Sequence, residues 1–89
     1  MKLLWTMIRG DWWEIAHTKI QSWGLTRYDK YRIEIDERVL GFQHLDTACH
    51  EWLHAAFPKM KESEVGQLGT ELASYLDVLG YVRKSDADF

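Results

Sequence analysis

The chain has 89 residues with a formal net charge of −3, and 46% of them are hydrophobic, including five tryptophans. This length and composition indicate a single globular domain spanning residues 1–89 and argue against a disordered chain. The 11 basic residues are interspersed with 14 acidic ones and form no run, so we expect no nucleic-acid partner.

The N-terminal segment has neither a targeting pattern nor a membrane-spanning pattern. The apolar stretch between Lys2 and Arg9 is too short for a signal-peptide core and far too short to cross a membrane. Cys49 is the only cysteine, which excludes an intrachain disulfide and fits a reducing compartment. We therefore expect a cytoplasmic protein without a membrane partner.

Three strands are predicted in the first 36 residues. Residues 3–8 and 12–20 are rich in β-branched and aromatic side chains, and the turn Arg9-Gly10-Asp11 between them predicts a hairpin. We expect residues 21–30 to form a loop. Residues 31–36, with the sequence YRIEID, alternate apolar and charged side chains. This alternation predicts a half-buried strand at or near a sheet edge.

Two helices are predicted in the second half of the chain. The first begins near His44 and ends at Pro58, which cannot continue a helix. The second runs from about Lys61 to Leu79, with Gly80 at its C-terminal cap. This order predicts an α+β fold in which a three-stranded, antiparallel-type sheet is followed by two helices. The end of the chain, residues 86–89, is expected to be a frayed tail.

The first predicted helix contains the pattern His-Glu-x-x-His. His50 and His54 share one face of this helix, with Glu51 beside them. The opposite, apolar face is expected to pack against the sheet and holds Leu45, Cys49, Trp52, Leu53 and Ala56. Imidazoles at positions i and i+4 can reach one Zn²⁺, and the intervening glutamate can act as general base. The alternative is that this short pattern arose by chance, as it does in unrelated proteins.

A catalytic zinc site needs a third protein ligand. The start of the second predicted helix offers Glu62 and Glu64, which come level with His54 if the helices fold back around Pro58. Glu71 lies roughly 10 Å farther along the helix axis, so geometry disfavours it. Either of the nearer glutamates could instead be a helix N-terminal carboxylate that compensates the helix dipole. Helix spacing alone leaves both of them open.

Residues 32–81 resemble small phage and bacterial metallopeptidases that are related in pattern to SprT-like and minigluzincin proteins. The similar features are the strand RIEID, the motif LDTACHEWLHA, the acidic turn ESEV and the helix end LGY. The resemblance implies a zincin-like fold with His50 and His54 as zinc ligands and Glu51 as general base. The family's acidic position, three residues before the valine, falls on Glu62 and makes it the third ligand. A phage origin would place the protein in the host cytoplasm.

Motif and resemblance together predict a zinc-dependent metallopeptidase that acts on a peptide or protein substrate. In the expected mechanism Glu51 accepts a proton from a zinc-bound water, and the resulting hydroxide attacks a peptide carbonyl. An extended substrate could pair with the predicted strand 31–36. By residue type, Tyr28, His17 and Tyr81 are candidate donors to the developing oxyanion.

Other interpretations remain open at the level of sequence. One is a non-catalytic, phage-type interaction module with a structural or vestigial zinc site, since the tryptophans suit an interface. His44 is an alternative ligand, although we expect it to face solvent near the helix start. Nucleic-acid association, as in DNA-repair relatives of the SprT type, lacks a basic patch here. The sequence leaves the substrate, the cleavage preference and the oligomeric state open.

Overall fold

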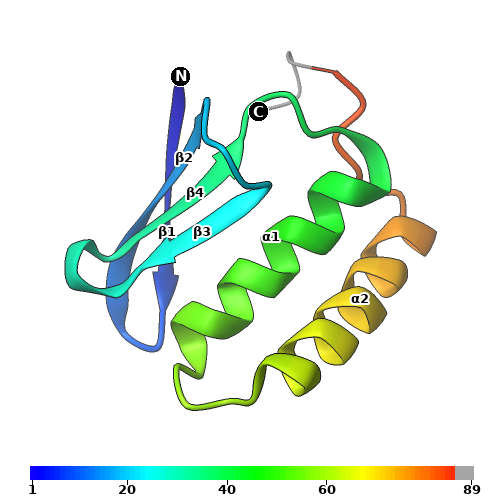
Figure 1. Cartoon of the computed structure of the whole chain (residues 1–89). Coiled ribbons are helices and arrows are strands. Elements are labelled where there is room, and N and C mark those ends of the chain that lie inside the picture. Colours follow the sequence, from blue (N-terminus) through cyan, green and yellow to red (C-terminus); the bar gives the residue numbers. More distant parts are fainter. Residues whose placement is uncertain (86–89) are drawn as a thin grey trace.

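A four-stranded sheet and two helices form an α+β fold (Figure 1). The computed structural model describes residues 1–85, so the predicted tail at 86–89 lies outside the described residues. In chain order the elements are β1 (Lys2–Ile8), β2 (Asp11–Thr18), β3 (Gly24–Arg27), a 3-10 helix η1 (Tyr28–Lys30), β4 (Arg32–Asp36), α1 (Gly41–Ala56) and α2 (Glu62–Val78). Within residues 1–85, no helix is long and apolar enough to cross a membrane.

The strands lie in the order β1-β2-β4-β3, with antiparallel pairing at both ends and a parallel pair in the middle. β1 and β2 form the predicted hairpin, whose turn holds Arg9 at φ 49° and Gly10 at φ 89°. Positive φ at both central residues is typical of the turn whose twist matches that of the strands. β2 and β4 run parallel, so the chain must cross over between them, and it forms β3 and η1 on the way.

The prediction of three antiparallel strands is wrong. A fourth strand, β3, forms within the segment expected to be a loop, and β4 pairs with β2 in parallel. β3 has only four residues, begins with a glycine and alternates weakly, so it gives little local signal. β3 occupies the sheet edge and β4 lies directly beside it, so β4 is near an edge, as expected, without being the edge strand itself.

The charged side chains of β4 form ion pairs, and its two carboxylates are buried. Glu34 and Asp36 are only 8% and 4% exposed. Arg32 lies 2.6 Å from Glu14 on β2, and Arg27 on β3 lies 3.0 Å from Glu34. Neighbouring strands supply the partners of Arg32 and Glu34, and Arg38 just after β4 supplies that of Asp36. The charged face of β4 is therefore more buried than its alternation predicts.

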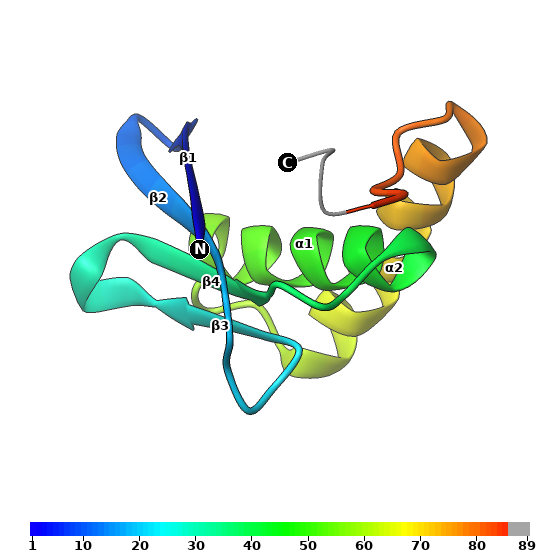
Figure 2. The ribbon, with the colours of Figure 1, turned by 90° about the horizontal axis from the view of Figure 1, so that it is seen from above.

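α1 lies between the sheet and α2, as two perpendicular views show (Figures 1 and 2). It begins at Gly41, three residues before the predicted start, and ends before Pro58 as predicted. α2 also lies close to its predicted range. Gly80 has φ 92° and donates its N–H to the carbonyl of Asp77 at 2.9 Å, which confirms it at the predicted cap.

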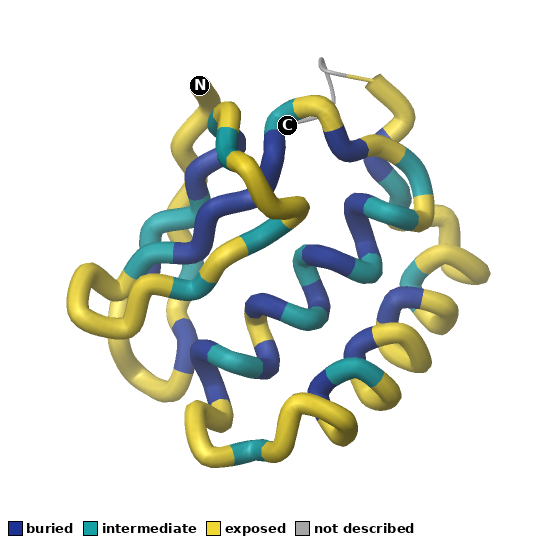
Figure 3. The backbone as a smooth tube through the Cα atoms, viewed as in Figure 1, coloured by how far each residue is buried: buried dark blue, intermediate teal, exposed yellow. Residues whose placement is uncertain are grey.

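Buried residues occur on two sides of α1, one facing the sheet and one facing α2 (Figure 3). The core between α1 and the sheet contains Ile8, Trp13, Ile33, Ile35, Ala55 and Ala56. Leu45 and Cys49 pack instead with Ala73 of α2. The prediction that the whole apolar stripe of α1 faces the sheet is therefore wrong, because a helix between two layers buries two faces. Trp52, from the same stripe, is 38% exposed.

Candidate metal centre

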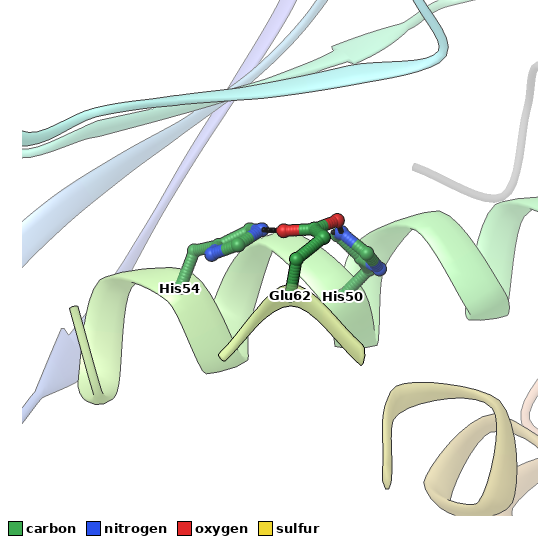
Figure 4. Close-up of side chains that lie close together, drawn as sticks. All are labelled: His50, His54 and Glu62. Atoms are coloured by element: carbon green, nitrogen blue, oxygen red, sulfur yellow. Dashed lines mark hydrogen bonds and ion pairs between the residues drawn. The ribbon is translucent and has the colours of Figure 1, made fainter. Parts of the chain in front are cut away.

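Two histidines and one glutamate bring their ligand atoms together (Figure 4). His50 and His54, one turn apart on α1, have their Nε2 atoms 3.1 Å from each other. Glu62, the first residue of α2, places Oε1 2.8 Å from Nε2 of His50 and Oε2 2.9 Å from Nε2 of His54. Ligands around tetrahedral zinc are about 3.3 Å apart for bonds of roughly 2.0–2.1 Å. The spacing and the chemistry of these donors therefore fit a zinc ion.

The connection between the helices brings Glu62 to the histidines. Residues 57–61 link α1 to α2, and Pro58 ends the first helix there. The helices approach closely at Gly69, where an added Cβ would lie 3.3 Å from the backbone N and Cα of His50. Because Gly69 has no side chain, α2 can lie directly against the backbone of α1 at His50.

The structure separates Glu62 from the other glutamates considered as third ligands. Glu64 lines a different hollow, which it shares with Arg9 of the hairpin turn. Glu71 lies farther along α2 and accepts a hydrogen bond from Gln67 at 3.4 Å. Of the three glutamates, Glu62 alone groups with both histidines.

β3 holds Glu51 beside this cluster. The side chain of Glu51 is 8% exposed, and its Oε1 accepts a hydrogen bond of 2.8 Å from the hydroxyl of Thr26. Gly24 leaves room for both helix side chains that face it, because an added Cβ would lie 2.9 Å from Cγ of Glu51 and 2.6 Å from Cγ2 of Thr47. Sequence reasoning missed Thr26 and Gly24, since both lie in the expected loop and neither belongs to a motif.

A cleft follows α1 past the three donors. Beside His54 it is lined by Gly24, Leu25, Thr26, Tyr28, His50, Glu51, His54 and Glu62. The adjoining hollow, toward the start of α1, is lined by Trp23, Gly24, Gln43, Asp46, Thr47, His50 and Glu51. Three of these lining residues carry carboxylates and none is a lysine or arginine, so the cleft is acidic.

Tyr28 is the predicted oxyanion donor that lines the cleft. Burial raises the pKa of its phenol, and the negative charges of Glu51 and then Glu62 raise it further. The phenol therefore keeps its proton and can donate a hydrogen bond into the cleft. Tyr81 is 67% exposed beyond the end of α2 and is not among the lining residues.

His17 and His44 form a separate buried pair, with their Nε2 atoms 2.9 Å apart and their rings stacked. They are 2% and 5% exposed, so the expectation that His44 faces solvent is wrong. α1 starts three residues earlier than predicted, which places His44 within the helix and against β2 instead of at a solvated end. Neither histidine lines the cleft, so neither is brought to the site for which it was considered.

No protein-family model, curated protein or solved structure matches this chain. A function therefore has to be inferred from the geometry of the cleft.

Proposed function

We propose that the chain is a zinc-dependent peptidase with a zincin-like site. The observation that carries this proposal is the grouping of His50, His54 and Glu62 beside Glu51, a carboxylate that a separate element holds in place. Three protein donors on one face of a tetrahedron leave the fourth position for water or substrate, as in catalytic zinc sites. A purely structural zinc site is usually closed by four protein ligands.

The residues of the cleft divide the proposed chemistry between them. When bound, a zinc ion acidifies a water ligand and polarises a carbonyl group. Glu51 would accept the proton of the attacking water and pass it to the leaving amine. Thr26 orients this carboxylate by donating to Oε1, which leaves Oε2 for the proton. The phenol of Tyr28 would donate to the carbonyl oxygen as negative charge develops there.

The outer strand β3 is the edge to which an extended substrate could add. Pairing with residues 31–36 was expected, but β4 has β2 on one side and β3 on the other. β3 has one unpaired edge and contributes Gly24, Leu25 and Thr26 to the lining of the cleft. A peptide added to this edge would run past the three donors, with main-chain hydrogen bonds providing affinity.

Metal content and peptide hydrolysis, measured on the same preparations, test the proposal. The wild type should bind about one zinc per chain and cleave an unfolded protein such as reduced casein. A chelator should abolish the cleavage and added zinc should restore it. Glu51→Gln should keep its zinc, because an amide oxygen can still accept from Thr26, and should lower kcat/KM roughly 10²–10⁴-fold.

The two ways in which the proposal can fail are distinguishable. A folded wild type that takes up no zinc, even when zinc is supplied, overturns the metal centre itself. A protein that binds zinc and cleaves neither casein nor a mixed-sequence peptide library overturns the peptidase, and leaves an interaction module with a structural zinc.

A further inference from the structure

β1 is an outer strand that α1 covers only at its end, where Ile8 is buried. It occupies the end of the sheet opposite β3, whereas α1 packs chiefly against β3 and β4. Leu4 and Trp5 point to opposite faces of the sheet, because successive side chains of a strand alternate. They are nevertheless 41% and 58% exposed. Both faces of β1 are therefore open around Leu4 and Trp5, and within residues 1–85 no strand pairs with its outer edge.

An apolar patch continues from β1 onto β2 on the face that α1 does not cover. It consists of the exposed side chains of Leu3, Trp5, Met7 and Trp12, with Met7 and Trp12 directly opposite each other across the hairpin. A tryptophan buries about 150–250 Å² in an interface, so the exposed parts of Trp5 and Trp12 together offer roughly 200–300 Å². With Leu3 and Met7 the patch reaches about 400 Å², a size that often marks an interaction site.

The two edges of the sheet differ in how they are protected. β3 has four residues, ends in Arg27 and borders the cleft. β1 has seven residues and contains neither a charge nor a proline from Leu3 to Ile8. Proteins usually protect exposed edges with charges, prolines or a short strand. An edge as long and uncharged as β1 is suited to pairing with another strand.

We infer that two copies of this chain pair through β1 in an antiparallel arrangement. Pairing around a two-fold axis at Trp5 is the register in which all seven residues of the strand, Lys2–Ile8, find a partner. The four strands of each copy would then form one continuous sheet, with the two apolar patches side by side. A two-fold axis makes such an interface self-complementary and closes it at a dimer.

The charges along the paired strands are compatible with a second copy of the chain. No like charges oppose each other within the strand, since residues 3–8 are uncharged. Lys2 of one copy would come opposite Ile8 of the other, and Asp11 is the cross-strand neighbour of Ile8 in the hairpin. In the same register Met1 would come opposite Arg9, but within each copy the Met1 amino group lies 3.8 Å from Glu37 and Arg9 lies over the ring of Phe57.

The size of the contact predicts a reversible dimer. Trp5 would meet Trp5 and Leu3 would meet Met7 across the seam, whereas Trp12 lies one strand farther away on β2. Only part of the roughly 800 Å² of the two patches would therefore leave water, and the paired backbones add to this. Specific interfaces bury about 1,200–2,000 Å² in total, so the contact lies below that range. Interfaces of this size are typical of weak, reversible association, so we expect a dissociation constant on the order of micromolar or weaker.

Sedimentation velocity of the full chain tests the inference, and it requires neither zinc nor a substrate. The wild type should change from monomer to dimer between about 1 and 200 µM. Trp5→Lys would place two ammonium groups opposite each other at the axis and should be monomeric throughout this range. Trp23→Lys is the matched control, because Trp23 is 63% exposed and lies near the opposite edge of the sheet. It should dimerise like the wild type.

A cross-link tests the register. Opposed residues of an antiparallel pair have Cα atoms about 4.5–5.5 Å apart, within the range of a disulfide. Trp5→Cys should therefore form a covalent dimer under mild oxidation, whereas Trp23→Cys should not. Cys49 is buried and should not compete. A wild type that stays monomeric, a dimer that survives Trp5→Lys, or a folded Trp5→Cys that does not cross-link would overturn the inference.

Discussion

The hydroxyl of Thr26 on β3 donates a 2.8 Å hydrogen bond to Oε1 of Glu51 on α1. The two residues are 25 positions apart in the sequence, so this contact forms only when the sheet and the helix pack together. In the proposed peptidase it sets the direction in which the general base points. Glu51 is therefore held by tertiary structure.

Thr26→Val should lower the rate of hydrolysis while leaving zinc binding unchanged. Valine keeps the shape of threonine and removes the donor, so the carboxylate loses its orientation. Loss of a hydrogen bond to a catalytic or ligating group typically costs roughly 10–100-fold in activity. The measurement is kcat/KM together with zinc content, and Thr26→Ser, which keeps the hydroxyl, should retain most of the activity. Equal rates for the valine and serine variants would contradict this role for Thr26.

Glu62→Gln should weaken zinc binding by at least about 100-fold, since it removes a charged donor from the site. Glu64→Gln is a matched control because both glutamates lie in the first turn of α2 and interact similarly with the helix dipole. Zinc affinity is measured by competition with a chromophoric chelator. If Glu64→Gln weakened zinc binding as much as Glu62→Gln, the proposed ligand set would be wrong.

Two glycines of α2 should respond in opposite ways to substitution by alanine. Gly66 has open space where a Cβ would lie, so Gly66→Ala should raise the free energy of unfolding by about 0.5–1 kcal/mol through helix propensity. At Gly69 the same methyl group would lie 3.3 Å from the backbone of His50. There the strain of moving two packed helices apart should outweigh the propensity gain and leave Gly69→Ala less stable than Gly66→Ala by about 1–3 kcal/mol.

Urea unfolding of the two variants, compared with the wild type, measures this difference. Gly69→Ala should also bind zinc more weakly, because it shifts the helix that carries Glu62 relative to the helix that carries His50. Equal stabilisation by both alanines would show that the helix contact at Gly69 can relax freely.

The buried pair His17–His44 should make the protein less stable in mild acid. Burial, then the charges of His17 and Arg83, lower the pKa of His44 to about 4, and burial, then Arg83 and Lys2, lower the pKa of His17. An unfolded histidine has a pKa of about 6.5, so below this pH the unfolded chain takes up protons that the folded chain does not. The free energy of unfolding should be unaffected above about pH 7 and fall by about 3 kcal/mol between pH 6.5 and pH 4 from His44 alone.

Urea unfolding at intervals between pH 7 and pH 4 measures this decline. His44→Gln should start from a lower stability at pH 7 and show a shallower decline, because it removes one of the titrating groups. Asp36 contributes in a different pH range: hydrogen bonds from Arg38, and then its charge, lower the pKa of the Asp36 carboxyl to about 2. Its contribution to stability is therefore lost as the pH falls from about 4 to about 2. Parallel declines for wild type and His44→Gln would exclude the histidine pair as the cause.

Features that depend on neighbouring residues were predictable from the sequence. The hairpin, both helices and the Gly80 cap follow from turn chemistry and helix periodicity, and the i, i+4 spacing places His50 and His54 on one face. Features that depend on distant pairing were not predictable in this way. β3 is too short to give a signal, and the parallel pairing of β4 with β2 depends on where the chain crosses over. An error of three residues in the start of α1 was enough to misplace His44.

The third donor and the residues that support the site also depend on distant packing, which local sequence patterns do not reveal. Glu62 and Glu64 differ by about 200° around α2, and spacing alone could not decide which one faces α1. The resemblance to metallopeptidases pointed to Glu62, and the structure places that residue beside both histidines. Thr26 and Gly24 belong to no motif, so only the packing of the sheet on α1 identifies them.

The three donors of the candidate metal centre all belong to the α1–α2 hairpin, between residues 50 and 62, whereas the residue that positions Glu51 belongs to the sheet. Closing so short a segment costs little chain entropy, so the sheet contributes little to bringing the three donors together. Orientation of the base needs the whole domain. Under the proposed function, a local loosening of β3 from α1 should therefore abolish activity while zinc is still bound.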